Sequence, residues 1–136
     1  QQGKGCPHCV NKTEAKTFGH LDELYDVTHQ FTTDLCPRKK FDMYISDFNV
    51  IIEVDGEQHF EQVGNWTSPE INRANDVYKM KCVEGVHRVI RIDRRDIVKN
   101  DDWKETMYDA LRSDEQVIYI SSDPTLYDEH KRLMTQ

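Results

Sequence analysis

The sequence predicts an α/β fold with a mixed central sheet, which contains an antiparallel hairpin and a βαβ crossover and is flanked by helices. Two runs rich in β-branched and aromatic residues, 41–45 and 50–54, flank the polar turn 46–49, which is typical of a hairpin. A helical pattern and another strand follow, and this strand should lie parallel to the hairpin's second strand. With 136 residues, 37% of them hydrophobic and 32% charged, we expect one compact domain with its own core.

The composition also indicates a cellular setting. No apolar run approaches the length of a membrane span and no signal peptide is visible, so no membrane partner is expected. The chain starts Gln1-Gln2 without a methionine, which favours a fragment of a longer protein or a processed product. Four cysteines, two of them in one short motif, favour metal ligands or free thiols over disulfides. This usage predicts a reducing compartment, the cytoplasm of a bacterium or of an infected cell.

The short motif is Cys6-Pro7-His8-Cys9, whose spacing presents two thiolates to one tetrahedral ion, as in a zinc knuckle. One such pair is half a site. Residues 3–9 resemble the second knuckle of a treble-clef or zinc-ribbon module, whose first ligand pair would lie upstream. The alternatives are closure within the chain by Cys36, Cys82 or His8, and two free thiols. We therefore interpret residues 1–10 as the remnant of a zinc module, with Zn²⁺ as a second candidate cofactor.

The first elements precede the hairpin. Asn11 or Thr13 can cap a helix that runs to about Tyr25 and carries Glu14 in its first turn. The apolar side of this helix would be formed by Ala15, Phe18, Leu21, Leu24 and Tyr25. Alternating apolar residues in 27–31 predict a first strand.

The hairpin gathers acidic side chains. Pairing Ile45 with Val50 sets Asp42 opposite Glu53, and Asp55 shares the face of Glu53 because side chains alternate along a strand. Two like charges at a cross-strand separation of roughly 5 Å repel by about 3 kcal/mol at an effective dielectric constant of about 20. A divalent cation such as Mg²⁺ or Mn²⁺ offsets this repulsion. These three residues are therefore candidate metal ligands, and the alternative is that they are solvated edge charges.

A histidine follows the acidic residues. His59 lies four positions beyond Asp55 and after the flexible Gly56, so it can return to the same patch. An imidazole there would act as a general base or a general acid near neutral pH.

The hairpin region also resembles a known family. Asp42, ten intervening residues and Glu53-Val54-Asp55 resemble the PD-(D/E)xK nuclease signature, with Asp55 in the place of the usual lysine. The segment FDMYISDFNVIIEVDGEQHF is similar to the branch that includes the Vsr-like (very-short-patch-repair) endonucleases and the EDxHD homing endonucleases. The resemblance spans about residues 5–112 and implies a restriction-endonuclease-like core, which we place at 11–112. The missing lysine leaves the identity of the general base open.

The same resemblance implies two further site residues. NKTEAK resembles the segment whose helix glutamate reaches the active site, which makes Glu14 a candidate. QVGNWTSPEINRANDVYKMKC resembles the family's helix after the catalytic strand, where Asp76 takes the place of an active-site aspartate. Ser68 as N-cap and Pro69 at the first helical position predict where this helix begins, and it should end near Gly85. Its apolar side would be formed by Ile71, Ala74, Val77, Tyr78 and Met80.

The remaining elements follow in order. Residues 87–92 read as the crossover strand, and Asp101 or Asp102 caps a helix that runs to about Arg112. Trp103, Met107, Ala110 and Leu111 should pack inward from this helix. Residues 116–120 form a short strand, and Asp123-Pro124 opens a last helix. The extension 113–136 lies outside the resemblance and receives no task.

The charge of the chain bears on its partner. A formal net charge of −7 is unusual for a protein that binds nucleic acid, but basic residues gather locally. The candidate contacts with phosphates of double-stranded DNA are Lys39, Lys40, Lys79 and Arg91.

These observations lead to a functional hypothesis with alternatives. The leading one is a Mg²⁺-dependent endodeoxyribonuclease, a site-specific homing endonuclease of a mobile element or virus. The alternatives are a mismatch-directed nickase, a non-catalytic nucleic-acid-binding module on a nuclease fold, and a hydrolase of small phosphoesters. The sequence leaves the oligomeric state open, with a homodimer as one alternative.

Overall fold

The chain folds around a single five-stranded sheet of mixed direction. The computed structural model describes residues 7–64 and 68–136, and side chains from Asn11 onward. The strands lie in the sheet in chain order: β1 (Val27–Phe31), β2 (Phe41–Ile45), β3 (Val50–Asp55), β4 (Arg88–Asp93) and β5 (Val117–Ile120). The first three pair antiparallel and the last two join in parallel, so the mixed α/β sheet predicted from the sequence is confirmed.

The hairpin has the predicted register. Ile45 pairs with Val50, and the two strands continue in antiparallel pairing from there. Every residue of β3 is buried, as expected for a central strand covered on both faces. Val50, Ile52 and Val54 belong to one hydrophobic cluster and Ile51 to another, which confirms the alternation along the strand.

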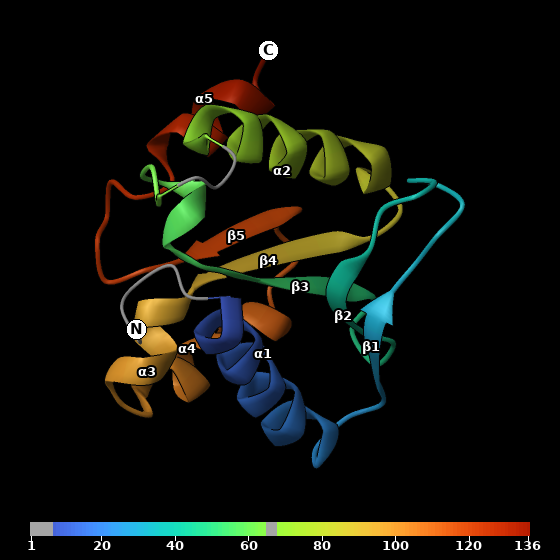
Figure 1. The fold of residues 1–136 in the computed structure, drawn as a ribbon. Coiled ribbons are helices and arrows are strands. Elements are labelled where there is room, and N and C mark those ends of the chain that lie inside the picture. The colour runs from blue at the N-terminus through green and yellow to red at the C-terminus, as the bar shows by residue number, and fades with distance from the viewer. Residues whose placement is uncertain (1–6, 65–67) are drawn as a thin grey trace.

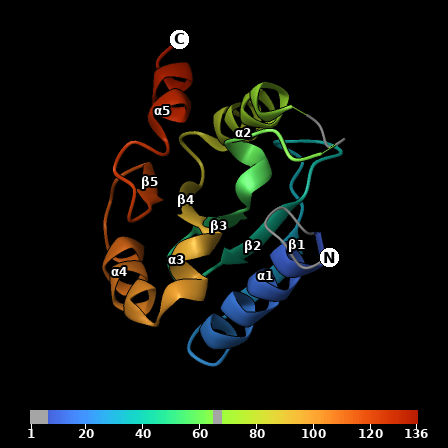
Figure 2. The ribbon, with the colours of Figure 1, turned by 60° about the vertical axis from the view of Figure 1, so that its left-hand side comes forward.

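Helices cover both faces of the sheet (Figures 1 and 2). On one face lie α1 (Pro7–Asp22), α3 (Arg94–Lys99) and α4 (Asp102–Leu111); on the other lie α2 (Pro69–Val83) and α5 (Asp128–Met134). A core around Leu21, Ile52, Ile97 and Met107 fills the first layer. A smaller core around Ile51, Met80 and Val83 fills the second. The sheet is therefore the middle of three layers.

The crossover unit forms as the sequence predicts. Ser68 caps α2 by accepting a hydrogen bond from the Ile71 N–H, and Pro69 is the first helical residue. The helix ends at Val83, and Gly85 follows with a φ of +84°, a backbone conformation that glycine adopts without strain. β4 then pairs parallel to β3, and Asp55 meets Asp93 at the end of the ladder.

Three helix boundaries differ from the predicted ones. α1 begins at Pro7, within the residues that we interpreted as a knuckle, and not at Asn11 or Thr13. It ends at Asp22, before the predicted end near Tyr25. The last helix begins at Asp128, since 123–127 form hydrogen-bonded turns first. The short helix α3, capped by the Asp93 side chain, was not predicted.

The buried faces of two helices also differ from prediction. Thr13, Glu14 and Thr17 are buried polar residues on α1, whereas Ala15 and Leu24 are exposed. On α2, Ile71 and Tyr78 are 61% and 52% exposed, and Asp76 and Lys79 are buried in their place. An apolar pattern misplaces both faces because each helix turns charged side chains inward.

The predicted zinc site lies at the edge of what the structure describes. Cys6 is outside the described residues, and Cys9 lies in the first turn of α1, where side chains are not described. Cys36 and Cys82 are free thiols packed in the α2 layer, on the face of the sheet opposite α1. Burial, together with the neighbouring Cys82, raises the pKa of Cys36 to about 12, which disfavours a metal-binding thiolate. The alternative in which these two cysteines close the zinc site is therefore not supported.

Candidate active site

The carboxyl end of β3 brings together the functional side chains. Glu53 and Asp55 leave the strand on the face that α2 covers. Gly56 and the short 3₁₀ helix η1 (Glu57–His59) then turn the chain back, so that His59 returns to the end of its own strand. α2 supplies Asp76 and Lys79 from above.

Glu53 and Glu14 each lie near enough to Asp42 for their charges to act on its carboxyl, and we call these three residues the acidic cluster. Asp42 Oδ2 accepts a hydrogen bond of 2.7 Å from the Val54 N–H, so the β2 side chain is fixed against β3. Glu14 Oε2 accepts hydrogen bonds from His29 Nε2 at 2.8 Å and from Gln30 Nε2 at 2.7 Å. Gln30 has a φ of +56°, which is unusual for a residue with a Cβ and marks a fixed, strained position. A backbone N–H thus holds the Asp42 carboxylate in place, and two side chains hold that of Glu14.

The charge within the acidic cluster is only partly neutralised. Burial, followed by the negative charges of Glu53 and Glu14, raises the pKa of Asp42 well above its ordinary value, although the Val54 N–H acts in the opposite direction. Two cationic side chains of the described residues neighbour Glu53: Lys79 Nζ lies 2.8 Å from its Oε2, and Arg91 lies opposite it in the β3–β4 ladder and interacts with its charge. The two atoms are not aligned as a hydrogen bond, and within the described residues this buried oxygen accepts none. Lys79 donates instead to the carbonyl of Lys40 at 2.6 Å.

A variant tests this excess of negative charge. The raised pKa of Asp42 means that the folded protein keeps a proton that the unfolded chain releases, so the free energy of unfolding falls as pH rises through that range. Asp42→Asn removes the ionisable carboxyl and keeps an acceptor for the Val54 N–H. In EDTA at pH 7.5 we expect it to stabilise the protein by about 0.5–2 kcal/mol, measured by urea unfolding. An equal loss of stability would contradict the charge imbalance.

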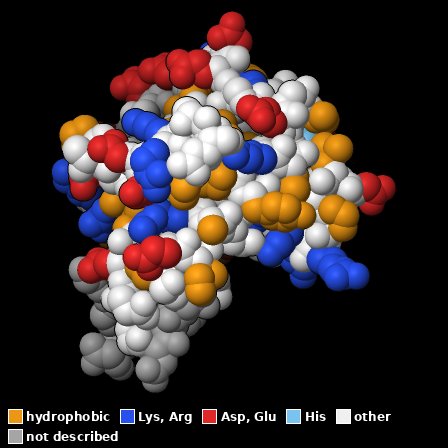
Figure 3. Space-filling view, turned by 90° about the horizontal axis from the view of Figure 1, so that it is seen from above, with side chains coloured by type: hydrophobic (Ala, Val, Ile, Leu, Met, Phe, Trp, Pro, Cys, Tyr) orange, Lys and Arg blue, Asp and Glu red, His pale blue; other side chains and the backbone are white. Residues whose placement is uncertain are grey.

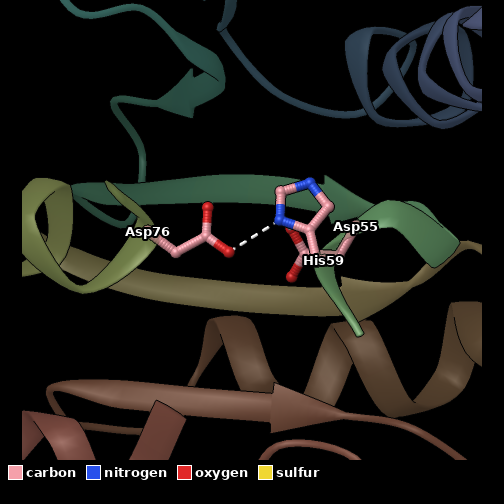
Figure 4. A group of neighbouring side chains, drawn as sticks. All are labelled: Asp55, His59 and Asp76. Carbon is pink, nitrogen blue, oxygen red and sulfur yellow. Dashed lines mark hydrogen bonds and ion pairs between the residues drawn. The ribbon is translucent and has the colours of Figure 1, made fainter. Parts of the chain in front are cut away.

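Asp55, His59 and Asp76 form a second group, which Figure 4 shows. His59 Nδ1 lies 2.7 Å from Asp76 Oδ2 and 3.8 Å from Asp55 Oδ1. Since the carboxylate is the acceptor, Nδ1 carries the proton, and the ring's other nitrogen points away from Asp76 (Figure 4). This is the arrangement in which a carboxylate orients an imidazole for proton transfer.

A buried arginine joins the two aspartates. Arg91 on β4 is 1% exposed, and its Nη1 and Nη2 lie 3.1 Å from Asp55 Oδ1 and 3.0 Å from Asp76 Oδ1. Burial would raise the pKa of Asp76, but the Arg91 charge and hydrogen bonds from two histidines outweigh burial and hold it well below its ordinary value. Burial likewise lowers the pKa of His59, but the charges of Asp55 and Asp76 dominate and raise it. The histidine is therefore biased toward its protonated form.

The two groups differ in their fit to a divalent cation. Asp55, His59 and Asp76 offer ligand atoms within 4.8 Å of one another, which is the spacing of a metal site. Their carboxylates, however, already share the guanidinium of Arg91, which neutralises them. The acidic cluster has a raised carboxyl pKa and contains Glu53 Oε2, which pairs with Lys79 but accepts no hydrogen bond from the described residues. Hard oxygen donors with unbalanced negative charge suit Mg²⁺, so the acidic cluster is a second candidate for the ion, although among the described residues only Asp55, His59 and Asp76 have the ligand spacing of a metal site.

The structure thus divides the predicted constellation. Glu14, Asp42 and Glu53 lie in the acidic cluster, whereas Asp55 lies with His59 and Asp76. Asp55 was expected to be a metal ligand beside Glu53, but hydrogen bonds and the Arg91 ion pair use its carboxylate.

The four predicted DNA contacts have different positions. Arg91 was expected to bind phosphate; this is wrong, because its buried guanidinium is bound to two aspartates. Lys79 is also buried, so it can meet only a phosphate that enters the acidic cluster. Lys40 is exposed, and Lys39 is half-buried with its Nζ 2.6 Å from Asn75 Oδ1. The basic turn before β2 therefore remains the accessible part of the predicted contact surface.

Sequence reasoning missed two residues of the second group. Tyr127 Oη donates to Asp55 Oδ2 at 2.9 Å, and His130 Nε2 donates to Asp76 Oδ2 at 3.0 Å. Both belong to the extension 113–136, 72 and 54 positions away from their partners. No local pattern links a tyrosine and a histidine in a terminal segment to carboxylates so distant in the chain.

Comparisons with other proteins add no family or structural neighbour. The chain matches no protein-family model, no curated protein and no solved structure. Among the described residues, no helix is both long enough and apolar enough to cross a membrane.

Proposed function

We propose that the protein is a metal-dependent DNA endonuclease, related to the Vsr-like and EDxHD branch of the PD-(D/E)xK nucleases. The observation that carries the proposal is the pairing of two chemistries at the end of β3. The first is the acidic cluster, in which burial and neighbouring negative charges raise the pKa of Asp42. The second is His59, four residues after Asp55, whose ring is oriented by the carboxylate of Asp76. Phosphodiester hydrolysis needs both stabilisation of charge on phosphate and proton transfer.

Asp42 and Glu53 would hold the divalent cation, with Glu14 completing the cluster. A bound Mg²⁺ or Mn²⁺ supplies an activated water and stabilises charge on the scissile phosphate. The Val54 N–H and the side chains of His29 and Gln30 orient the carboxylates before the ion arrives. Lys79, 2.8 Å from Glu53, neutralises part of the cluster and faces any phosphate that enters it.

His59 would act as the general acid. Its Nδ1–H is held by Asp76, and the charges of Asp55 and Asp76 raise its pKa above the ordinary value, which shifts the ring toward the protonated form. The other ring nitrogen then carries a proton that can pass to the leaving oxygen. Because the side chain keeps 20% of its surface exposed, a substrate can reach it.

The accessible basic residues favour a polyanion as substrate. The turn that contains Lys39 and Lys40 lines a hollow of about 620 Å³ with Arg38 and Pro37. Figure 3, which looks onto the α2 and α5 side, shows Lys and Arg side chains among hydrophobic and acidic ones on this face. Phosphate contacts of this kind supply non-specific affinity for DNA despite a net charge of −7. Within the branch we favour a site-specific homing endonuclease, which needs a long specific DNA site. A mismatch-directed nickase needs only a short mismatched site, so the substrate separates the two.

The proposal is tested by cleavage of supercoiled plasmid in Mg²⁺, in Mn²⁺ and in EDTA. We expect nicked or linear product only with metal, and His59→Ala should lower the rate by about 10²-fold because proton transfer is lost. His87→Ala is the matched control, since His87 contacts Asn49 at the opposite end of β3. Absence of cleavage at any metal concentration, together with salt-sensitive DNA binding, would favour the non-catalytic binding module.

A further inference from the structure

The turn before α5 and the helix itself place two side chains against the group of Asp55, His59 and Asp76, which we call the Asp–His group. Tyr127 is 2% exposed and donates its hydroxyl to Asp55 Oδ2. His130 is fully buried and lies 3.0 Å from Asp76 Oδ2. These hydrogen bonds cross from the C-terminal segment to β3 and α2.

The protonation of His130 follows from its partners. An ionised Asp76 only accepts hydrogen bonds, so His130 Nε2 must carry the proton. Its Nδ1 is buried and has no partner among the described residues, which suits a bare nitrogen rather than a second donor. Asp76 Oδ2 thus receives donors from both His59 and His130, while its Oδ1 faces Arg91.

Aromatic rings fix these two donors. Tyr127 and His130 contact each other edge to face, with ring centroids 5.2 Å apart. Phe60, next to His59, packs against Tyr127 at 5.3 Å, and Tyr119 on β5 packs against it at 4.9 Å. The donors therefore have little freedom to turn away from the carboxylates.

We infer that Tyr127 and His130 are positioning residues of the active site, and that the C-terminal segment belongs to the catalytic unit. This inference rests on the proposed function for its catalytic meaning. The two side chains hold Asp55 and Asp76 in the orientation in which they face His59. Their hydrogen bonds also stabilise part of the negative charge of these carboxylates.

The groups that face His59 come from four elements. Asp55 on β3 and Asp76 on α2 favour its protonated form, and Arg91 on β4 opposes it. His130 on α5 shares the oxygen of Asp76 that His59 uses. Removing a donor from either carboxylate leaves more negative charge for His59, so its protonated form should persist to higher pH.

The inference is tested by following the ring resonances of His59 by NMR during a pH titration. In Tyr127→Phe and in His130→Phe we expect the midpoint to move to higher pH by roughly half a unit, with the ring packing retained. Tyr119→Phe is the matched control, because its ring lies in the same aromatic cluster but its hydroxyl donates to neither aspartate, and its midpoint should stay at the wild-type value. His130→Gln, which keeps a donor, should restore the wild-type midpoint.

A second readout connects the inference to catalysis. The alkaline limb of the pH–rate profile for plasmid cleavage should move with the NMR midpoint in the two phenylalanine variants. Midpoints unchanged in both variants would overturn the inference, and if His130→Phe does not fold, Tyr127→Phe alone decides. The NMR titration needs no activity, so a shifted midpoint in a protein that cuts nothing would refute the endonuclease and leave the positioning role intact.

Discussion

Replacing Arg91 by methionine is expected to lower the free energy of unfolding by about 3–5 kcal/mol. The guanidinium is 1% exposed and neutralises Asp55 and Asp76, which are themselves 1% and 3% exposed. Methionine fills much of the same volume but leaves two carboxylates buried without a cation, and that uncompensated charge makes up most of the cost. Urea unfolding at pH 7.5 measures the change.

Two comparisons isolate the charge effect. Arg132→Met removes an exposed arginine whose ion pair with Glu129 is also exposed, and it should cost at most about 1 kcal/mol. Adding Asp55→Asn to Arg91→Met should recover part of the lost stability, because one unpaired charge is removed. A cost below 1 kcal/mol for Arg91→Met would mean that the arginine does not neutralise the site.

Replacing Asp42 by asparagine is expected to lower the rate of plasmid cleavage by about 10³-fold or more. Without the metal the transition state would lose several kcal/mol of stabilisation, and each 1.36 kcal/mol added to the barrier slows the reaction tenfold. Asparagine keeps the size of the side chain and an acceptor for the Val54 N–H, so the fold should be preserved. Single-turnover cleavage in Mg²⁺ measures the effect.

The control for this variant is Asp114→Asn, the same chemical change at an exposed position outside the site. It should cut at the wild-type rate. Because Asp42→Asn is also expected to be more stable than the wild type in EDTA, a loss of cleavage cannot come from unfolding. Full activity in Asp42→Asn would remove this residue from the catalytic site.

The parts of the fold that local patterns specify could be predicted from the sequence. Alternating apolar residues and a short turn specify the hairpin, and Ser68-Pro69 specifies the start of α2. The order of strand, helix and strand then specifies parallel pairing of β4. The start of α1 was missed although Pro7 is its first helical residue, because the Cys-x-x-Cys spacing of residues 6–9 favoured a knuckle. α3 was missed because it is only six residues long, although Asp93 caps it.

The site could be predicted only in part, for a related reason. The alternation on β3 places Glu53 and Asp55 on one face, but it does not say which carboxylate an arginine will neutralise. From sequence, Arg91 is expected at the surface, because a charged side chain is rarely buried without a partner. It is buried because Asp55 and Asp76 pair with it, and the sequence does not show that pairing. Tyr127 and His130 reach the site by tertiary packing alone.

We propose that the acidic cluster, and not the group of Asp55, His59 and Asp76, holds a divalent cation. Titration of Mn²⁺ followed by electron paramagnetic resonance tests it most directly on wild type, Asp42→Asn and His59→Ala. We expect one bound Mn²⁺ in the wild type and in His59→Ala, and none in Asp42→Asn at the same free concentration. Binding kept in Asp42→Asn and lost in His59→Ala would place the ion between Asp55, His59 and Asp76 and contradict a metal site in the acidic cluster.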